Sequence, residues 1–252
     1  MNRLGFVDRL IGLEREEVGD VLVGRLPIRD HTRNPVGGLR TGVLLTAVDA
    51  VGGMRCGLAG LPQWIVSTNL MVTVGRTEHA GPLRFEARLL RSGRSAGVAA
   101  VDVIDEGAGD HRVAHGLLTA AFLEPADGPP PLARPVSIHP EPPEEMPVDL
   151  ESAFAITDGT TLTVREDLRN RWGILHGGAI AVLADVAAER AIGAGISTDT
   201  VLHFLSPART GPVEARTRVA GQRADGAVVI VDIHDTGHDD RHVAVASVRV
   251  AL

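Results

Sequence analysis

Two long stretches of the chain are apolar on nearly every side. They cover residues 42–59 and 178–193. A surface helix of that length would carry a polar stripe, so the pattern predicts two helices that are buried on most sides. Each of them needs a sheet curved around it to cover its apolar surface.

The segments after each predicted helix alternate between apolar and polar positions, which is typical of strands with one buried face. The pattern predicts strands at 83–89, 98–104 and 113–122, and again at 213–219, 228–234 and 243–250. Turns rich in Gly and Asp at 105–110 and 235–240 join the last two strands of each set as hairpins. Each half is therefore predicted to be α+β: a strand, one long helix, then several antiparallel strands.

The two sets of elements share one sequence pattern. Asn34, Gly42 and Asp49 recur 136 positions later as Asn170, Gly178 and Asp185, while later landmarks such as 81–82 recur at an offset of 130. We assign the difference of six to an inserted loop at 58–63. Two matched series in the same order indicate a duplicated domain.

A proline-dense segment separates the two halves. Proline excludes a helix or a central strand there, so the segment is predicted to be a stiff extended connector. This gives a first domain at 1–124, a linker at 125–147 and a second domain at 148–252.

Composition removes several classes of function. The net charge is −7 and no Lys/Arg run occurs, which argues against a nucleic-acid partner. The single cysteine excludes an internal disulfide. The N-terminal region mixes charge into every turn, and the apolar runs are shorter than the roughly 18–20 residues of a bilayer span. We therefore expect a cytoplasmic protein with no membrane partner.

Residues 170–185, NRWGILHGGAIAVLAD, resemble the signature of hotdog-fold acyl-CoA thioesterases of the phenylacetic-acid-degradation type. The run FLSPARTGP at 204–212 is similar to a strand end of that family, and 34–43, NPVGGLRTGV, is a weaker copy of the first motif. The resemblance implies a double hotdog, in which two long helices are wrapped by a shared antiparallel sheet. It also implies hydrolysis of an acyl-CoA substrate without a metal or organic cofactor.

The pair Gly177-Gly178 opens the second predicted helix directly after His176. The first amides of a helix have no internal partner and carry the positive end of its dipole, so they can polarise a thioester carbonyl and stabilise its oxyanion. A tight turn that requires glycine is the alternative. Asn170 would donate an amide hydrogen to the thioester oxygen or orient water, or it is a turn residue.

Asp49 and Asp185 each interrupt an apolar helix. A buried carboxylate is costly unless it is hydrogen-bonded or catalytic, and burial raises its basicity, which suits activation of water. The alternative is that each Asp caps the helix of the other half. Gly177 and Asp185 are about 12 Å apart along one helix axis, so one helix cannot present both to one carbonyl carbon.

In the family that the motif resembles, the site is composite, with the amide and the carboxylate on opposite units. Carried over, this pairs Asn170, His176 and Gly177 with Asp49, and it places the hydroxyl of Ser67 near that carboxylate. The other site would hold a different set of residues: Asn34, Arg40, Thr41, Asp185 and Ser197.

The second site departs from the motif. Arg40 stands where His176 stands, and Thr41 stands where Gly177 stands. We expect that site to be impaired, or repurposed so that Arg40 faces a phosphate or a carboxylate.

Three histidines at the 235–240 hairpin, His234, His238 and His242, are interpreted as part of a solvated turn rather than as metal ligands. The main rival to a thioesterase is a non-catalytic acyl-CoA-binding or sensing protein. A hydratase would need a His placed with a carboxylate on the helix, and both helices carry Asp without His. The fold that the resemblance implies also suggests a homo-oligomer.

Overall fold

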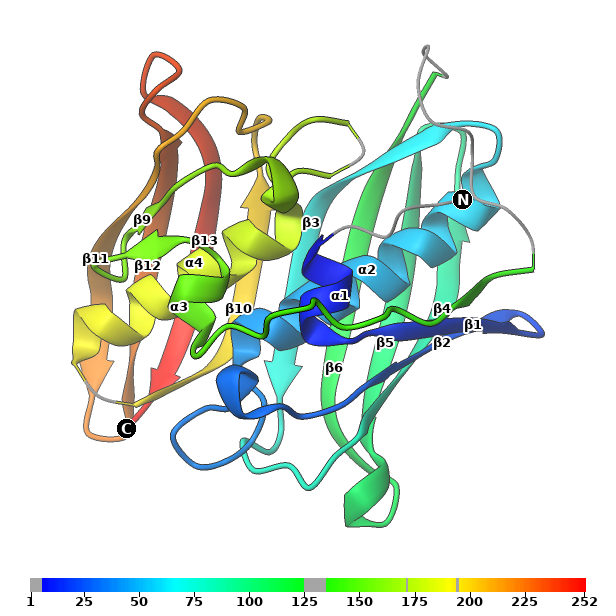
Figure 1. Cartoon of the computed structure of the whole chain (residues 1–252), viewed down its shortest axis with the longest axis horizontal. Helices are drawn as coiled ribbons and strands as arrows, with labels where there is room; N and C mark the ends of the chain where they lie inside the picture. Colours follow the sequence, from blue (N-terminus) through cyan, green and yellow to red (C-terminus); the bar gives the residue numbers. More distant parts are fainter. Residues whose placement is uncertain (1–5, 125–134, 171, 194) are drawn as a thin grey trace.

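The computed structural model describes residues 6–124, 135–170, 172–193 and 195–252. One antiparallel sheet curves around two long helices, α2 and α4, which lie side by side on its concave face (Figure 1). This confirms the α+β hotdog architecture that the sequence predicts. The short helix α1 and the chain leading to α3 cross over the side of α2 that the sheet leaves open (Figure 1).

Elements of the first half occupy these bounds: α1 Phe6–Ile11, β1 Glu14–Val18, β2 Val21–Leu26, α2 Thr41–Gly60, β3 Trp64–Val74, β4 Leu83–Ser92, β5 Ala96–Asp105 and β6 His111–Leu123. Strand β7 Ser137–Ile138 lies in the segment between the halves. Elements of the second half are α3 Leu150–Ala153, β8 Ile156–Thr157, β9 Thr161–Leu162, α4 Gly177–Ile192, β10 Ile196–Phe204, β11 Val213–Arg223, β12 Gly226–Asp235 and β13 Arg241–Ala251. Short 3-10 turns occur at Asp30–Thr32, Glu106–Ala108 and Glu166–Leu168.

The strands are ordered β7-β1-β2-β4-β5-β6-β3-β10-β13-β12-β11-β9-β8. The halves meet where β3 pairs antiparallel with β10, from Val72 opposite Thr200 to Asn69 opposite His203. Along the described chain β10 pairs with no residue of β3 before Asn69, so the first residues of β3 have strand β6 on one side only. The ladder between the halves is therefore open beside 64–68.

Glycines let the two helices cross closely. A Cβ atom on Gly42 of α2 would lie 2.8 Å from the Cα of Val182 on α4, and one on Gly178 would collide with Thr46. The hydroxyl of Thr46 also donates to the carbonyl of Gly178 at 3.2 Å. The start of each helix thus meets the middle of the other, and the helices run antiparallel.

Helix α2 forms much of the core, as its apolar sequence predicts. It is long and apolar enough to meet the length and composition criteria for a membrane-spanning helix, yet 72% of the qualifying window is buried inside the protein. Sheet strands and α4 cover it, which is the arrangement of a core helix.

The expected loop at 58–63 is partly helical. Helix α2 continues to Gly60, whereas α4 ends at Ile192 with Gly193 in the left-handed conformation. The insertion therefore lengthens α2 to 20 residues against 16 in α4. Leu58 is buried there, and Gly60 leaves room for the ring of Phe122, so packing favours the extra helical turn.

The alternation of buried and exposed side chains that the sequence predicts for β11 is present only at the start of the strand. Val213 and Ala215 are buried, but Thr217 is exposed and Val219 is 47% exposed. The additional turn of α2 has no counterpart in α4, so the far end of β11 extends past the helix that would cover it.

Residues 125–134 of the expected linker lie outside the described residues. In the remainder, β7 adds to the sheet edge by pairing with Arg15 and Glu16 of β1. Farther along, the backbone carbonyls of Glu141 and Pro142 accept hydrogen bonds from Arg9. The described part of the segment is thus attached to the first half.

Candidate active site

Asp49 lies on α2 and is hydrogen-bonded to the first strand after that helix. The hydroxyl of Ser67 donates to Oδ1 of Asp49 at 2.5 Å. The Asp49 side chain remains partly exposed. A half-buried carboxylate is thus fixed in orientation.

The start of α4 lies against this carboxylate from the other half. A Cβ atom on Gly177 would be 3.0 Å from Oδ2 of Asp49 and 3.2 Å from Cζ of Phe204. Glycine is therefore needed there for the helix start to approach so closely. His176 is the N-cap residue, and its Nδ1 accepts from the amide of Gly178 at 3.0 Å.

That cap leaves the preceding amide available. Within the described residues the N–H of Gly177 has no hydrogen-bond acceptor, as expected for the first amide of a helix. The Gly177 backbone and Asp49 therefore face the same small space from opposite halves. An amide donor and a carboxylate base in that arrangement suit addition to a polarised carbonyl.

Burial raises the pKa of Asp49 above its usual value, because the charged form loses solvation. The nearby His176 and the hydrogen bond from Ser67 act in the opposite direction but do not cancel the effect. Asp49 is thus a stronger base than an ordinary surface carboxylate.

The side chain of Asn170 stabilises the loop in which it lies. Its side-chain oxygen accepts from the amides of Trp172 at 2.9 Å and Ile174 at 3.4 Å. Asn34 does the same in the first half, accepting from the amide of Gly38 at 2.8 Å. Both residues behave as the turn residues of the alternative interpretation, and each positions the start of a long helix.

Arg40 stands in the second site where His176 stands in the first. Its positive charge is neutralised by acidic side chains of this chain. Its Nε lies 3.3 Å from Oδ2 of Asp185, and its Nη2 forms an ion pair with Glu189. Asp185 is only 1% exposed. The Arg40 guanidinium is thus paired with two acids of α4, which leave it unsuited to an external phosphate.

Thr41 and Ser197 also differ from their counterparts. The hydroxyl of Thr41 donates to the backbone carbonyl of Ser197 at 2.5 Å. The hydroxyl of Ser197 is buried and has no hydrogen-bond partner in the described chain, whereas that of Ser67 is bound to Asp49. The structure does not give Asp185 the hydroxyl contact that Asp49 has.

Glu189 is a site residue that the sequence analysis missed. Its Oε1 accepts from the amide of Ser197 at 2.8 Å, and the residue at the matching position of α2 is Gly53. Burial, with the neighbouring Asp185, raises the pKa of Glu189 to about 7 despite the attraction of Arg40. The spacing of four residues from Asp185, which puts both acids on one helix face, was the signal that could have identified it.

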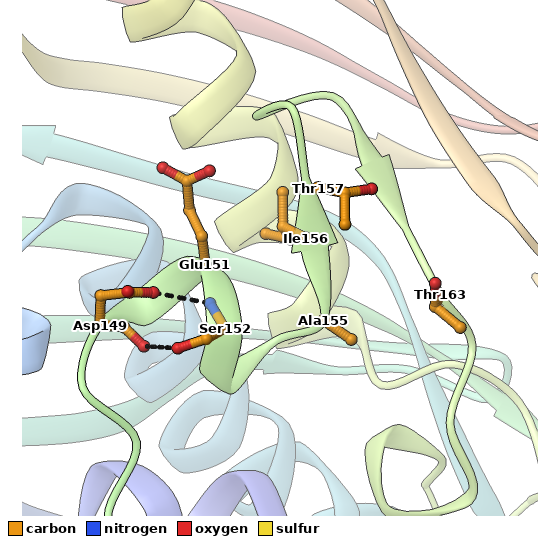
Figure 2. Close-up of a pocket in the computed structure, with 7 residues that line it drawn as sticks. All are labelled: Asp149, Glu151, Ser152, Ala155, Ile156, Thr157 and Thr163. Carbon is orange, nitrogen blue, oxygen red and sulfur yellow. Dashed lines mark hydrogen bonds between the residues drawn. The ribbon is translucent and has the colours of Figure 1, made fainter.

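The remaining polar clusters have local explanations. The rings of His234 and His242 stack with centroids 4.6 Å apart across the β12–β13 hairpin. In the described part of the chain no group of three His, Cys, Asp or Glu side chains is placed to hold a metal ion. A hollow beside α3 is lined by Asp149 and Glu151, but Asp149 caps that helix by accepting from the amide of Ser152 at 2.7 Å (Figure 2).

Comparison with known proteins gives one family match, which covers part of the second half. Residues 173–241 match the thioesterase superfamily. No protein among curated sequences matches the chain.

Several solved structures resemble the whole chain. An acyl-ACP thioesterase from Bacteroides thetaiotaomicron is 12% identical, with a TM-score of 0.64 over 92% of this chain and 98% of its own. The 12:0-ACP thioesterase from Umbellularia californica is 11% identical, with a TM-score of 0.64 over 92% and 94%. A hotdog-fold protein of unknown function from Alicyclobacillus acidocaldarius is 14% identical, with a TM-score of 0.60 over 98% and 97%.

These likenesses establish the hotdog fold across almost the whole chain. The sequence match, which begins just before α4 and ends in β13, bears out the expected enzyme class, a thioester hydrolase, at the level of the superfamily.

Proposed function

We propose that the protein is an acyl-CoA thioesterase with one working site per chain, formed by Asp49 and Ser67 of the first half with His176 and Gly177 of the second. The observation that carries the proposal is the close approach of Gly177, whose amide has no acceptor among the described residues, to the Asp49 carboxylate of the other half.

In this reaction the thioester carbonyl oxygen accepts a hydrogen bond from the Gly177 amide, and the positive end of the α4 dipole stabilises the oxyanion that develops there. In one route Asp49 attacks the carbonyl carbon directly and expels the CoA thiolate, and water then hydrolyses the resulting mixed anhydride, which frees the acid and Asp49 and supplies the proton to the thiolate. In the other route Asp49 takes a proton from water as the water oxygen bonds to that carbon. Breaking the carbon–sulfur bond releases CoA, which receives the proton, and leaves the carboxylic acid.

The other site residues support this geometry. Ser67 orients the Asp49 carboxylate through its hydrogen bond. His176 holds the amide of Gly178, so the helix begins with the Gly177 amide turned toward the substrate. Asn170 shapes the loop that leads to that amide. No step requires a metal or an organic cofactor.

The second site is proposed to be inactive. Arg40 would fill the space of the thioester, Thr41 replaces the glycine that admits it, and Asp185 is sealed from solvent. In this proposal one chain therefore contains one active site and one inactive site.

We expect Asp49→Asn to lower thioester hydrolysis by about 10²–10⁴-fold, because it keeps size and removes the base. Asp185→Asn is the matched control and should leave turnover within a few-fold. Release of CoA from a panel of acyl-CoA esters is followed with a thiol-reactive dye. Both variants are first compared with the native protein by circular dichroism and thermal unfolding.

Four outcomes would contradict the proposal. Equal losses in the two variants would mean that both sites work or that both carboxylates are structural. A loss confined to Asp185→Asn would refute the pairing across the halves. Retention of acyl-CoA without release of CoA would identify a binding protein instead. Turnover only of acyl carrier protein thioesters would mean that the substrate's acyl group is carried by that protein and not by CoA.

A further inference from the structure

The short helix α1 contacts the second half at the loop that leads to α4. The ring centroid of Phe6, at the start of α1, lies 5.7 Å from Cζ of Arg165. The 3-10 turn Glu166–Leu168 also contacts α1, and the carbonyl of Leu168 accepts from the amide of His176 at 2.9 Å. Helix α1 therefore lies beside the segment that ends in the N-cap residue of α4.

Asp8 is the acidic residue of α1, and a buried arginine fixes its position. Nη2 of Arg15, on β1, lies 3.0 Å from Oδ1 of Asp8. The Arg15 side chain is 5% exposed and the Asp8 side chain is 14% exposed. Neither charge could stay so far from water without the other, so the pair holds the Asp8 carboxylate in one place.

The ion pair faces the part of α2 that carries Asp49. Arg15 is opposite Gly24 in the β1–β2 ladder, so both residues face the same side of the sheet. A Cβ atom on Gly24 would lie 2.7 Å from Cγ2 of Val51, which shows that α2 packs on that side. Val51 follows Asp49 by two residues, and Figure 1 shows α1 across the middle of α2. Burial is the main cause of the raised pKa of Asp49, and the negative charge of Asp8 adds to it.

The second half repeats this arrangement. Gly12 and Ala155, both left-handed, follow α1 and α3, and counting back from them matches Asp8 with Glu151. Glu151 lines the hollow beside α3 (Figure 2), and its charge acts on the guanidinium of Arg40 in the second site. Each short helix thus places one acid close to the site of its own half.

We propose that Asp8 is a positioning residue of the Asp49 site: its carboxylate, fixed by Arg15, opposes loss of the proton from Asp49 and so sets the pH range in which Asp49 serves as a base. Asp8 acts through Asp49 and touches no reacting atom. His176 and Ser67 face the same carboxylate and act in the opposite direction. A base that holds its proton more firmly is stronger once it is ionised. The inference rests on the proposed thioester hydrolysis.

Asp8→Asn tests this role, because it keeps the shape of the side chain and removes its charge. Asp49 then loses a repulsive neighbour and the charge of Arg15 is no longer offset, so the acid limb of kcat/KM should move to lower pH by about half a unit or more. Asp8→Glu keeps the charge and should keep the native limb. Asp20→Asn, in the exposed turn after β1, should also leave it in place. A purely structural role would lower kcat/KM without moving the limb, and an unmoved limb in folded Asp8→Asn would overturn the proposal.

A direct titration separates this proposal from the hydrolysis itself. The carboxyl resonance of Asp49, identified by its absence in Asp49→Asn, is followed by NMR against pH in the native protein and in Asp8→Asn. Its midpoint should be lower in Asp8→Asn. If no thioester is turned over but the midpoint falls, hydrolysis is refuted and the role of Asp8 stands. Equal midpoints would refute that role, and Asp8→Ser, which is smaller and also uncharged, provides the same comparison if Asp8→Asn does not fold.

Discussion

Individual side chains distinguish the two sites more clearly than their shared backbone does. Ser67 and Ser197 occupy matching positions, yet only Ser67 donates to the carboxylate of its site. The residue type alone is the same in both halves. Its effect depends on the neighbouring side chains, because the carboxylate of Asp185 lies against Arg40 rather than against Ser197.

Ser67→Ala tests the link between that hydroxyl and the base. A hydrogen bond to the charged carboxylate lowers the pKa of Asp49, so its loss should raise that pKa further. Because the proposed mechanism uses the ionised form of Asp49, the acid limb of the pH profile of kcat/KM should move to higher pH by about one unit. Ser197→Ala serves as the control and should not move it. An unmoved limb in Ser67→Ala would contradict this role.

Glu189 should make stability depend on pH. Its pKa is raised from 4.5 to about 7 in the folded protein, so the folded state binds more protons than the unfolded state between those values. The associated stability is present below pH 4.5 and is lost as the pH rises through about 7. In Glu189→Gln this loss should shrink. Urea unfolding at pH 5 and pH 8 measures it, with the exposed Glu214→Gln as a control that should keep the native pH dependence.

Secondary-structure elements were predictable where one pattern dominates them. Apolar periodicity predicted α2 and α4 to within two residues at each end, and alternation predicted strands within β4, β5, β6, β11, β12 and β13. The end of β11 could not be predicted, because its burial depends on the length of a helix that is distant in sequence. The Trp64–Trp172 stack could not be predicted either, because nothing in the sequence around each tryptophan indicates a contact between the halves. Glu189 resembled a polar helix end, although α4 packs that end against β10.

Replacing either of two glycines of α2 by alanine should change the free energy of unfolding, and the two changes should have opposite signs. In Gly42→Ala the added Cβ meets the backbone of α4 at 2.8 Å, so the helices must separate, and unfolding free energy should fall by about 1–3 kcal/mol. In Gly53→Ala the added Cβ has ordinary contact with Ile65 at 3.5 Å, and the better helix propensity of alanine should stabilise by up to about 1 kcal/mol. Chemical denaturation of both variants measures the difference. Equal effects would show that the helix crossing is not tightly packed.

At the scale of the whole molecule, the convex face of the sheet is the candidate for self-association. Met71, Leu117, Val201 and Val245 are partly exposed on neighbouring strands around the β3–β10 junction, on the face opposite the helices. An apolar surface that crosses both halves suits packing against a second copy of the chain.

Light scattering should therefore give a mass above the 26.5 kDa of one chain, and Val201→Glu should lower it. Val219→Glu, on the other face of the sheet, should leave the mass unchanged. A 26.5 kDa particle at high protein concentration would rule out this association.

The ion cluster of Arg40, Asp185 and Glu189 occurs at one helix start only, which is possible because the two helix starts are encoded by separate codons. In a symmetric homodimer, one codon change alters both sites, so replacing the helix-opening glycine by threonine would damage every copy of the site at once. Here the two helix starts are encoded separately, and Thr41 can arise while Gly177 is retained. If the Asp49 site alone carries turnover, as proposed, the other helix start is free to change without loss of activity. Its residues Arg40, Asp185 and Glu189 instead form ion pairs that hold α2 against α4.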